Sequence, residues 1–318
     1  MRMYMPFVWT HIIFGEELLQ KSGLSSIIED PRLKQIFNLG CQGPDVLFYH
    51  NYLPWRNSRF ATELGNMMHA KECGPFILQL INEVKNRSIK DPALIYTIGF
   101  ITHHILDRTM HPFVFYHSGF TPLMHQRFEI IMDTLIVKAK LGIDTWRTPT
   151  WKLLAYEKSL LKEIPVIMHK IAKQLYPEHS KHVQLQEWRD SYRQMIQAQK
   201  IFHDPHGIKM KLTFGLLEPY VYKRTNAPLD YLNEQHAEWN CPTSLAEKHT
   251  DSIWDLWDKA RLEGVEILIE LSRILKTIQQ NKSANFNRLI ELLGNISYDS
   301  GKPCDSSLEI IHVKSMIG

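Results

Sequence analysis

The sequence predicts an all-α fold, and three observations support it. Apolar residues recur at helical spacing along most of the 318 residues, helix caps and prolines punctuate that pattern, and the alternation typical of strands is scarce. With 44% hydrophobic and 22% charged residues, the composition is that of a folded protein. No internal repeat or low-complexity linker divides the chain. We therefore expect one helical bundle domain over residues 1–295 and a polar tail over 296–318 that is weakly ordered or separately packed.

Two helices are marked at both ends. Asp91 is a suitable N-cap for a helix that begins at Pro92 and ends before Pro112. A second helix begins at Pro122 and ends at Gly142, because glycine favours the left-handed conformation that terminates helices. Apolar periodicity predicts further helices over residues 65–84, 151–175, 184–202, 245–279 and 286–293.

Charge and cysteine content exclude several classes of protein. Lys and Arg number 37 against 34 Asp and Glu, and the net charge of +3 is spread too thinly for a duplex nucleic-acid binder. The four cysteines form no CxxC pair and are too few for a disulfide scaffold, which favours a reducing compartment. No apolar run approaches the roughly 18 residues of a membrane span, and no secretion signal is recognisable. The sequence therefore predicts a cytoplasmic protein.

Eight of the 16 histidines fall within the first 125 residues, where they are intermixed with carboxylates. His103, Asp107 and His111 are spaced by four, as are His125 and Glu129 in the next helix. Four residues rotate by about 40° and rise by about 6 Å along an α-helix, so each pair lies on one face and can reach a common cation. A single such pair is common as a solvated hydrogen bond. Two pairs with a fifth ligand between them favour a metal site.

Two neighbouring polar residues are expected to support the site without binding metal. His104 lies outside the four-residue register, so we expect it in the core or behind the ligands. Asp133 extends the stripe that contains His125 by one turn, and we expect a structural carboxylate, or one that orients a histidine, rather than a direct ligand.

These residues occur together with the motifs WTH (residues 9–11), GPD (43–45), HHILDRTMHP (103–112) and HQRFE (125–129), and with an isolated His69. The combination resembles the zinc-dependent phospholipase C family, which is related in fold to the S1/P1-type single-strand nucleases. The resemblance spans residues 5 to about 135. It implies a single all-α domain whose active site contains three zinc ions.

The resemblance also implies eight zinc ligands. They match the family pattern in order and in residue type: His11, Asp45, His69, His103, Asp107, His111, His125 and Glu129. The last three would bind one zinc ion. A second ion would be bound by Asp45, His69, His103 and Asp107. Asp107 would also bridge to a third ion, bound by His11. For the position of His69, the nearby His50 is an alternative.

The number of ions depends on the start of the chain. In secreted members of the family, an N-terminal tryptophan chelates one zinc through its amino group and carbonyl, whereas Trp9 is internal here. We therefore expect two or three Zn²⁺ ions. The three ligand carboxylates contribute about −3, so two ions leave about +1 and three leave about +3, a charge that attracts a phosphodiester. Asp45 could act as a ligand or as a general base.

The function predicted from these patterns is zinc-dependent hydrolysis of a phosphodiester, as in phospholipase C. Zinc ions about 3.5–4 Å apart would activate water and stabilise the leaving alkoxide. The expected substrate is a phospholipid or another phosphodiester, with transient contact at a membrane surface and no duplex nucleic acid as partner. Two alternatives remain open: an S1/P1-like nuclease or phosphoesterase, and a non-catalytic helical protein that uses metal for folding.

Overall fold

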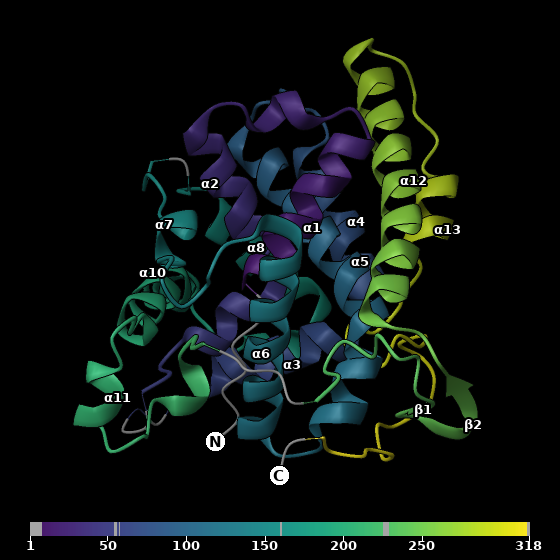
Figure 1. The fold of residues 1–318 in the computed structure, drawn as a ribbon. Coiled ribbons are helices and arrows are strands. Elements are labelled where there is room, and N and C mark those ends of the chain that lie inside the picture. Colours follow the sequence, from purple (N-terminus) through teal and green to yellow (C-terminus); the bar gives the residue numbers. More distant parts are fainter. Residues whose placement is uncertain (1–7, 54–55, 57, 160, 225–228, 317–318) are drawn as a thin grey trace.

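The computed structural model describes residues 8–53, 56, 58–159, 161–224 and 229–316. Helices make up most of it, which confirms the all-α prediction (Figure 1). The first part of the chain forms α1 (Val8–Lys21), η1 (Ser25–Ile28), α2 (Pro31–Gly40), η2 (Gly43–Tyr49), α3 (Phe60–Ala70), α4 (Cys73–Val84), α5 (Pro92–Ser118) and α6 (Pro122–Leu141). The rest forms α7 (Trp151–Leu154), α8 (Ile164–Leu175), α9 (Pro177–Ser180), α10 (Leu185–Phe202), α11 (Ile208–Leu212), η3 (Glu218–Tyr220), β1 (Trp239–Cys241), β2 (Ser244–His249), α12 (Ile253–Gln279) and α13 (Asn287–Leu293).

Helix α5 is the central element of the fold. It packs against α1, α2, α4, α6 and α12, and α12 stands along one side of the molecule in Figure 1. Residues 93–107 of α5 are buried without interruption, because neighbouring helices cover all of its faces. Helix α2 approaches so closely that a Cβ atom at Gly40 would lie 2.2 Å from the carbonyl oxygen of Tyr96. The side chains of residues 93–107 therefore sit in an interior that excludes water.

The prediction that the central helix ends before Pro112 is wrong. Helix α5 continues to Ser118 with Pro112 inside it. A proline in a helix interior removes one hydrogen bond and costs about 3 kcal/mol. Burial of Phe113, Val114 and Tyr116 in the following turn outweighs that cost. As a result, His111 projects from within a continuous helix rather than from its end.

The other predicted helices were located correctly, but several of their ends were wrong. Helices α6, α10 and α13 follow the prediction, with Gly142 as the left-handed C-terminal residue of α6. The predicted 65–84 helix is two helices, because Glu72 adopts a left-handed conformation at φ 52° between α3 and α4. The predicted 151–175 helix also forms as two separate pieces, α7 and α8. The predicted 245–279 helix begins only at Ile253, capped by Ser252, and the residues before it form strand β2, antiparallel to β1.

The segment after α13 folds back onto the helical body. Residues 295–304, which we call the 295–304 hairpin, are closed by two backbone hydrogen bonds, in which Cys304 donates to Asn295 and Ser297 donates to Lys302, each at 2.9 Å. The backbone nitrogens of Lys314 and Met316 then donate to the carbonyl oxygens of Tyr116 and His117, near the end of α5. The segment predicted as a tail thus contacts the helical body along much of its described length.

Among the residues that the structure describes, no helix combines the length and apolarity needed to cross a bilayer.

Candidate metal centre

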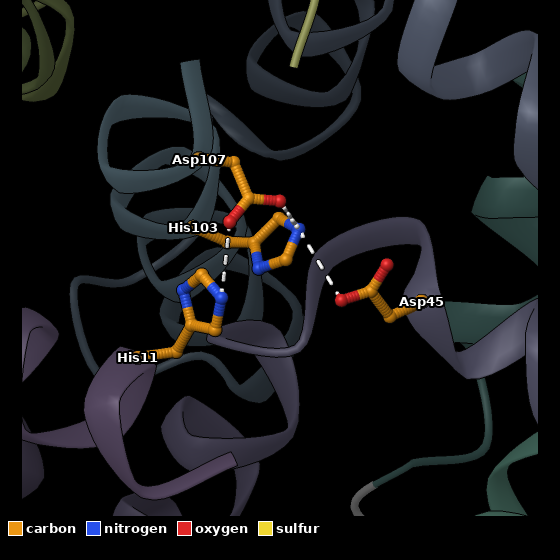
Figure 2. A group of neighbouring side chains, drawn as sticks. All are labelled: His11, Asp45, His103 and Asp107. Carbon is orange, nitrogen blue, oxygen red and sulfur yellow. Dashed lines mark ion pairs between the residues drawn. The ribbon is translucent and has the colours of Figure 1, made fainter. Parts of the chain in front are cut away.

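Four of the predicted ligands meet where α1, η2 and α5 converge. Figure 2 shows the side chains of His11, Asp45, His103 and Asp107 beside one another. Each of them places a ligand atom within 4.8 Å of the others. Asp107 lies between two histidines, with Oδ1 3.1 Å from Nε2 of His11 and Oδ2 3.0 Å from Nε2 of His103. Asp45 Oδ2 lies 3.7 Å from the same nitrogen of His103. All four side chains are buried.

His69, from the last turn of α3, extends this group. Its Nε2 lies 2.9 Å from Oδ1 of Asp45, so the Asp45 carboxylate has one oxygen toward His69 and the other toward His103. His50, the alternative candidate, instead lies in the electrostatic field of Glu187 and Asp190 on α10. The structure therefore places His69, rather than His50, beside Asp45.

Three more predicted ligands form a second group on α5 and α6. The ligand atoms of His111, His125 and Glu129 lie within 4.8 Å of one another. Glu129 Oε1 is 3.2 Å from Nε2 of His125, one helical turn away, and 3.6 Å from Nε2 of His111. His111 Nε2 is also 3.7 Å from Oδ1 of Asp107. His111 therefore connects the two groups into one continuous cluster.

The histidine rings are oriented from behind. His103 donates from Nδ1 to the carbonyl oxygen of Cys41 at 3.1 Å, and His69 donates from Nδ1 to that of Gly65 at 2.8 Å. A carbonyl oxygen can only accept, so in the neutral ring the Nε2 lone pair of each histidine faces the cluster. His125 Nδ1 lies 3.0 Å from the hydroxyl of Ser118. The contacts of His69 and His103 present nitrogen lone pairs to a shared centre, as metal binding requires.

Gly43 of the GPD motif gives the His103 ring its space. Its φ of +50° is in the left-handed region, and a Cβ atom there would lie 2.0 Å from Cδ2 of His103. The chain turns at this glycine into η2, which carries Asp45 to the cluster. Only glycine satisfies both the backbone conformation and the close approach.

The buried carboxylates of the cluster favour the binding of positive charge. Burial opposes protonation of His69, but the hydrogen bond and charge of Asp45 outweigh it and raise the pKa to about 9. Burial likewise opposes protonation of His111, yet the charge of Asp107 and the hydrogen bond to Glu129 raise its pKa to about 10. Although burial disfavours their charged forms, Asp107 has its pKa held low by His103, and Glu129 by His125. The carboxylates are thus ionised in a buried site and attract cations.

Several donor atoms in the cluster have no well-directed hydrogen bond from the described residues. They are Nε2 of His103, Oδ2 of Asp107 and Oε2 of Glu129, all of them buried. Leaving such atoms unsatisfied costs about 1–3 kcal/mol each, and more for charged groups. Imidazole nitrogens and carboxylate oxygens are the donors that Zn²⁺ takes in proteins. The residues therefore fit zinc.

The cluster borders a cavity of about 390 Å³. Five of the predicted ligands line it: Asp45, His69, His111, His125 and Glu129. Its remaining wall is largely apolar, formed mainly by Phe48, Met67, Phe115, Phe120 and Ile310. A small molecule in this cavity would meet the charged cluster on one side and hydrophobic side chains on the other.

Two residues at the cluster were missed by the sequence analysis. The ring of buried Tyr298 lies 5.1 Å from that of His69 and 4.6 Å from that of His104, centroid to centroid. Asp299 Oδ1 lies 3.8 Å from Nδ1 of His111 and lines the cavity. Both belong to the 295–304 hairpin. The Asp-Ser-Gly sequence there indicates a turn, but no local signal shows where that turn docks.

The two residues expected to support the site differ in outcome. His104 is buried behind the cluster, as expected, and its Nε2 lies 3.0 Å from the carbonyl oxygen of Ile296. Asp133 is structural and lies outside the groups of potential ligands, as expected, but the alternative that it orients a histidine is wrong. Asp133 accepts instead from the backbone nitrogens of Trp9 and Thr10, at 3.3 and 2.7 Å, and from the hydroxyl of Tyr222 at 2.5 Å. Asp133 therefore anchors the start of α1, the helix that carries His11.

A third set of potential donor atoms lies outside this centre. Cys241, Glu247 and His249 come together in the β1–β2 hairpin. However, Lys302 Nζ lies 2.6 Å from both carboxylate oxygens of Glu247, so a protein cation already neutralises that carboxylate. We do not include this set in the metal centre.

A protein-family model described as "Zinc dependent phospholipase C" matches residues 10–194 of the chain. The matched segment contains all eight residues of the cluster. No curated protein and no solved structure matches the chain.

Proposed function

This chain belongs to the zinc-dependent phospholipase C family, and from that membership we propose that it is a zinc-dependent hydrolase of phospholipid-type phosphodiesters. The observation that carries the proposal is the cluster itself, in which histidines and carboxylates from five elements meet beside a cavity with an apolar wall. A phospholipid needs both features, since its phosphate is anionic and its glyceride portion is apolar.

We assign the donors to two firmly bound zinc ions and one weaker ion. The first would take His69, Asp45, His103 and Oδ2 of Asp107. The second would take His111, His125 and Glu129, which leaves a position open toward the cavity. The third would have only His11 and Oδ1 of Asp107 from the protein. Trp9 adds no amine there, because its backbone nitrogen is an amide that donates to Asp133.

Bound zinc would lower the pKa of water toward 7 and draw a phosphodiester to the site. Protein residues would supply proton transfer and would hold the ligands in position. Asp107 is enclosed, whereas Asp45 borders the cavity, so Asp45 can both bind metal and accept a proton from the attacking water. The hydrogen bonds behind His69 and His103 keep their Nε2 atoms fixed during this transfer. We therefore propose Asp45 as the catalytic carboxylate.

The cavity wall favours a lipid over a nucleic-acid strand. Among the described residues that line it, none is Lys or Arg. A protein that holds a single strand uses a positively charged groove that follows the backbone phosphates. Phe115, Phe120 and Met67 offer apolar surface instead. This is why we rank phospholipase activity above the nuclease alternative.

A group of exposed apolar side chains around α11 supports contact with a membrane surface. Leu212, Phe214 and Leu216 are 75%, 97% and 77% exposed. Exposed Lys211 adjoins them, so the segment, which we call the α11 patch, combines apolar and basic character that suits an anionic bilayer. In Figure 1, α11 lies toward the same end of the molecule as the turn between α5 and α6, which carries Phe120 of the cavity wall.

The experiment is a comparison of substrates with zinc as the variable. Purified protein is assayed on a choline phosphodiester reporter and on single-stranded DNA, before chelation, after chelation and after zinc is returned. We expect hydrolysis of the choline phosphodiester that disappears and returns with zinc, and that His125→Ala abolishes. Cleavage of DNA alone would establish the nuclease alternative. Stoichiometric zinc without any hydrolysis would identify the metal as structural.

A further inference from the structure

Two cysteines from distant parts of the sequence are in contact. The Sγ atoms of Cys73, the first residue of α4, and Cys304, the last residue of the 295–304 hairpin, lie 3.4 Å apart. Cys41 and Cys241 have different neighbours, since their sulfur atoms lie 3.5 Å from the hydroxyl of Thr102 and 3.2 Å from that of Thr243. The Cys73–Cys304 pair therefore stands apart from the other two thiols.

The backbone on both sides of this thiol pair is already held together. The carbonyl oxygen of His69 accepts from the backbone nitrogen of Tyr298 at 2.9 Å and from the hydroxyl of Ser297 at 3.1 Å. On the other side, the backbone nitrogen of Gly74 donates to Oδ1 of Asn295 at 3.3 Å. A Cβ atom at Gly74 would lie 1.9 Å from the carbonyl oxygen of Gly294, so the two segments touch directly. Small side-chain rotations can therefore bring the sulfur atoms to bonding distance without separating the segments.

We propose that Cys73 and Cys304 form a reversible disulfide that fastens the 295–304 hairpin to the start of α4. The hairpin is the segment that places Tyr298 against His69 and His104 and carries Asp299 to the cavity. A covalent bond at Cys304 fixes one end of that segment. At the other end, Asn295 already accepts a hydrogen bond from Gly74. The disulfide thus controls how firmly the 295–304 hairpin is held against the metal cluster.

The chemistry balances with a small-molecule disulfide, such as oxidised glutathione, as the oxidant. Cys304 is partly exposed and Cys73 is buried, so the reagent reaches Cys304 first. The Cys304 thiolate attacks one sulfur of the reagent, displaces a thiolate and forms a mixed disulfide. Cys73 then loses its proton and attacks the Cys304 sulfur, which expels the second thiolate. Two protein thiols lose two electrons and two protons, and the reagent is reduced to two thiols.

The test uses the full chain with its metal. Folded protein is incubated with oxidised glutathione, its remaining thiols are alkylated after denaturation, and peptides are mapped by mass spectrometry without reductant. We expect two of the four cysteines to be lost to alkylation and one linked peptide pair, containing Cys73 and Cys304. Backbone amides of residues 296–302 should exchange with deuterium at least about tenfold more slowly in the oxidised protein than in the reduced protein.

Variants separate this link from general oxidation. Cys73→Ser should stop at a glutathione adduct on Cys304, whereas Cys241→Ser should still form the link. Four alkylated thiols in the folded wild-type protein after prolonged oxidation would overturn the proposal, and so would a link that involves Cys41 or Cys241. A Cys73–Cys304 link with unchanged exchange across the hairpin would overturn its fastening role. None of these measurements depends on the hydrolytic activity.

Discussion

Nε2 of His11 lies 3.1 Å from Oδ1 of Asp107, and this contact joins the first helix of the chain to the central one. The other oxygen of Asp107 lies 3.0 Å from His103 on its own helix. One carboxylate therefore contacts two histidines from different elements, and the centre depends on how α1 and α5 pack as much as on either helix alone.

Asp107→Asn should remove at least one zinc ion per chain. An amide replaces a charged oxygen with a nitrogen that donates, so neither neighbouring histidine keeps a shared anionic partner. We expect hydrolysis to fall by more than the 10- to 100-fold that is typical of residues behind a metal ligand. Elemental analysis and initial rates measure both effects. Asp144→Asn, at an exposed carboxylate paired with Lys138, is the control and should change neither. Full zinc content in Asp107→Asn would remove this residue from the ligand set.

Gly43→Ala should disturb His103, because the added methyl group would lie 2.0 Å from its ring. Gly142→Ala is a matched control, since Gly142 has a similar positive φ of 71° but no atom within 4 Å of its Cβ position. Both variants strain the backbone by about 1 kcal/mol, but only Gly43→Ala should lose zinc affinity, by at least about tenfold. Competition with a fluorescent chelator measures this. Equal affinities in the two variants would show that the His103 ring needs no such space.

Asp133→Ala should weaken the anchoring of α1. The carboxylate accepts from Trp9, Thr10 and Tyr222, and its removal leaves several buried donors unsatisfied. We expect the free energy of unfolding in urea to fall by about 2–4 kcal/mol. When a chelator is titrated into the zinc-loaded variant, the ion at His11 should be the first to be lost. Tyr222→Phe removes a single donor and should cost only about 1 kcal/mol. A stable Asp133→Ala protein with unchanged zinc binding would contradict this role.

The free energy of unfolding should depend on pH through His117. Burial, with a smaller effect of Lys314, lowers the pKa of His117 to about 4, whereas an unfolded histidine has a pKa of about 6.5. Between these values the unfolded chain binds more protons, so stability falls as the pH decreases. From pH 7.5 to pH 5 the loss from this group is at most about 2 kcal/mol.

His117→Phe tests this dependence. Its ring packs near Phe113 and Phe128, so phenylalanine keeps the aromatic contacts and removes the titration. Urea unfolding at pH 7.5 and pH 5, with zinc saturating in both proteins, should show a smaller acid loss in the variant. Parallel pH profiles for the two proteins would assign the acid loss to other groups.

The α11 patch should contribute to binding of vesicles but not to hydrolysis of soluble substrates. Leu212→Ser with Phe214→Ser removes two side chains that are 75% and 97% exposed, so folding should not suffer. We expect at least about tenfold weaker binding to vesicles that contain phosphatidylserine, with unchanged hydrolysis of a soluble phosphodiester. Leu262→Ser, at a leucine on α12 that is 71% exposed, is the control. Equal vesicle binding in all three proteins would exclude α11 as the contact.

Helix geometry made part of this centre predictable. The four-residue spacing on α5 and α6 fixed which side chains share a face, and their distances follow from local structure. The end of α5 was not predictable, because burial of Phe113, Val114 and Tyr116 outweighed the local cost of Pro112. The same holds for the boundary at Glu72, where a left-handed residue divides one amphipathic pattern into two helices.

Long-range packing determined the rest. His11 and Asp45 come from separate elements, α1 and η2, so the resemblance to a family, and not their spacing, indicated that they meet. Tyr298 and Asp299 had neither kind of signal. They reach the cluster because the carbonyl oxygen of His69 accepts from the backbone of Tyr298, and no sequence pattern near either residue announces that hydrogen bond.

The docking of Tyr298 has a consequence for synthesis of the protein. The eight ligand residues leave the ribosome long before the hairpin that covers them is translated. A nascent chain can therefore gather its histidines and acquire metal while Tyr298 is still absent. A product truncated after residue 294 would retain the whole ligand set, but water and competing chelators would reach it from the uncovered side.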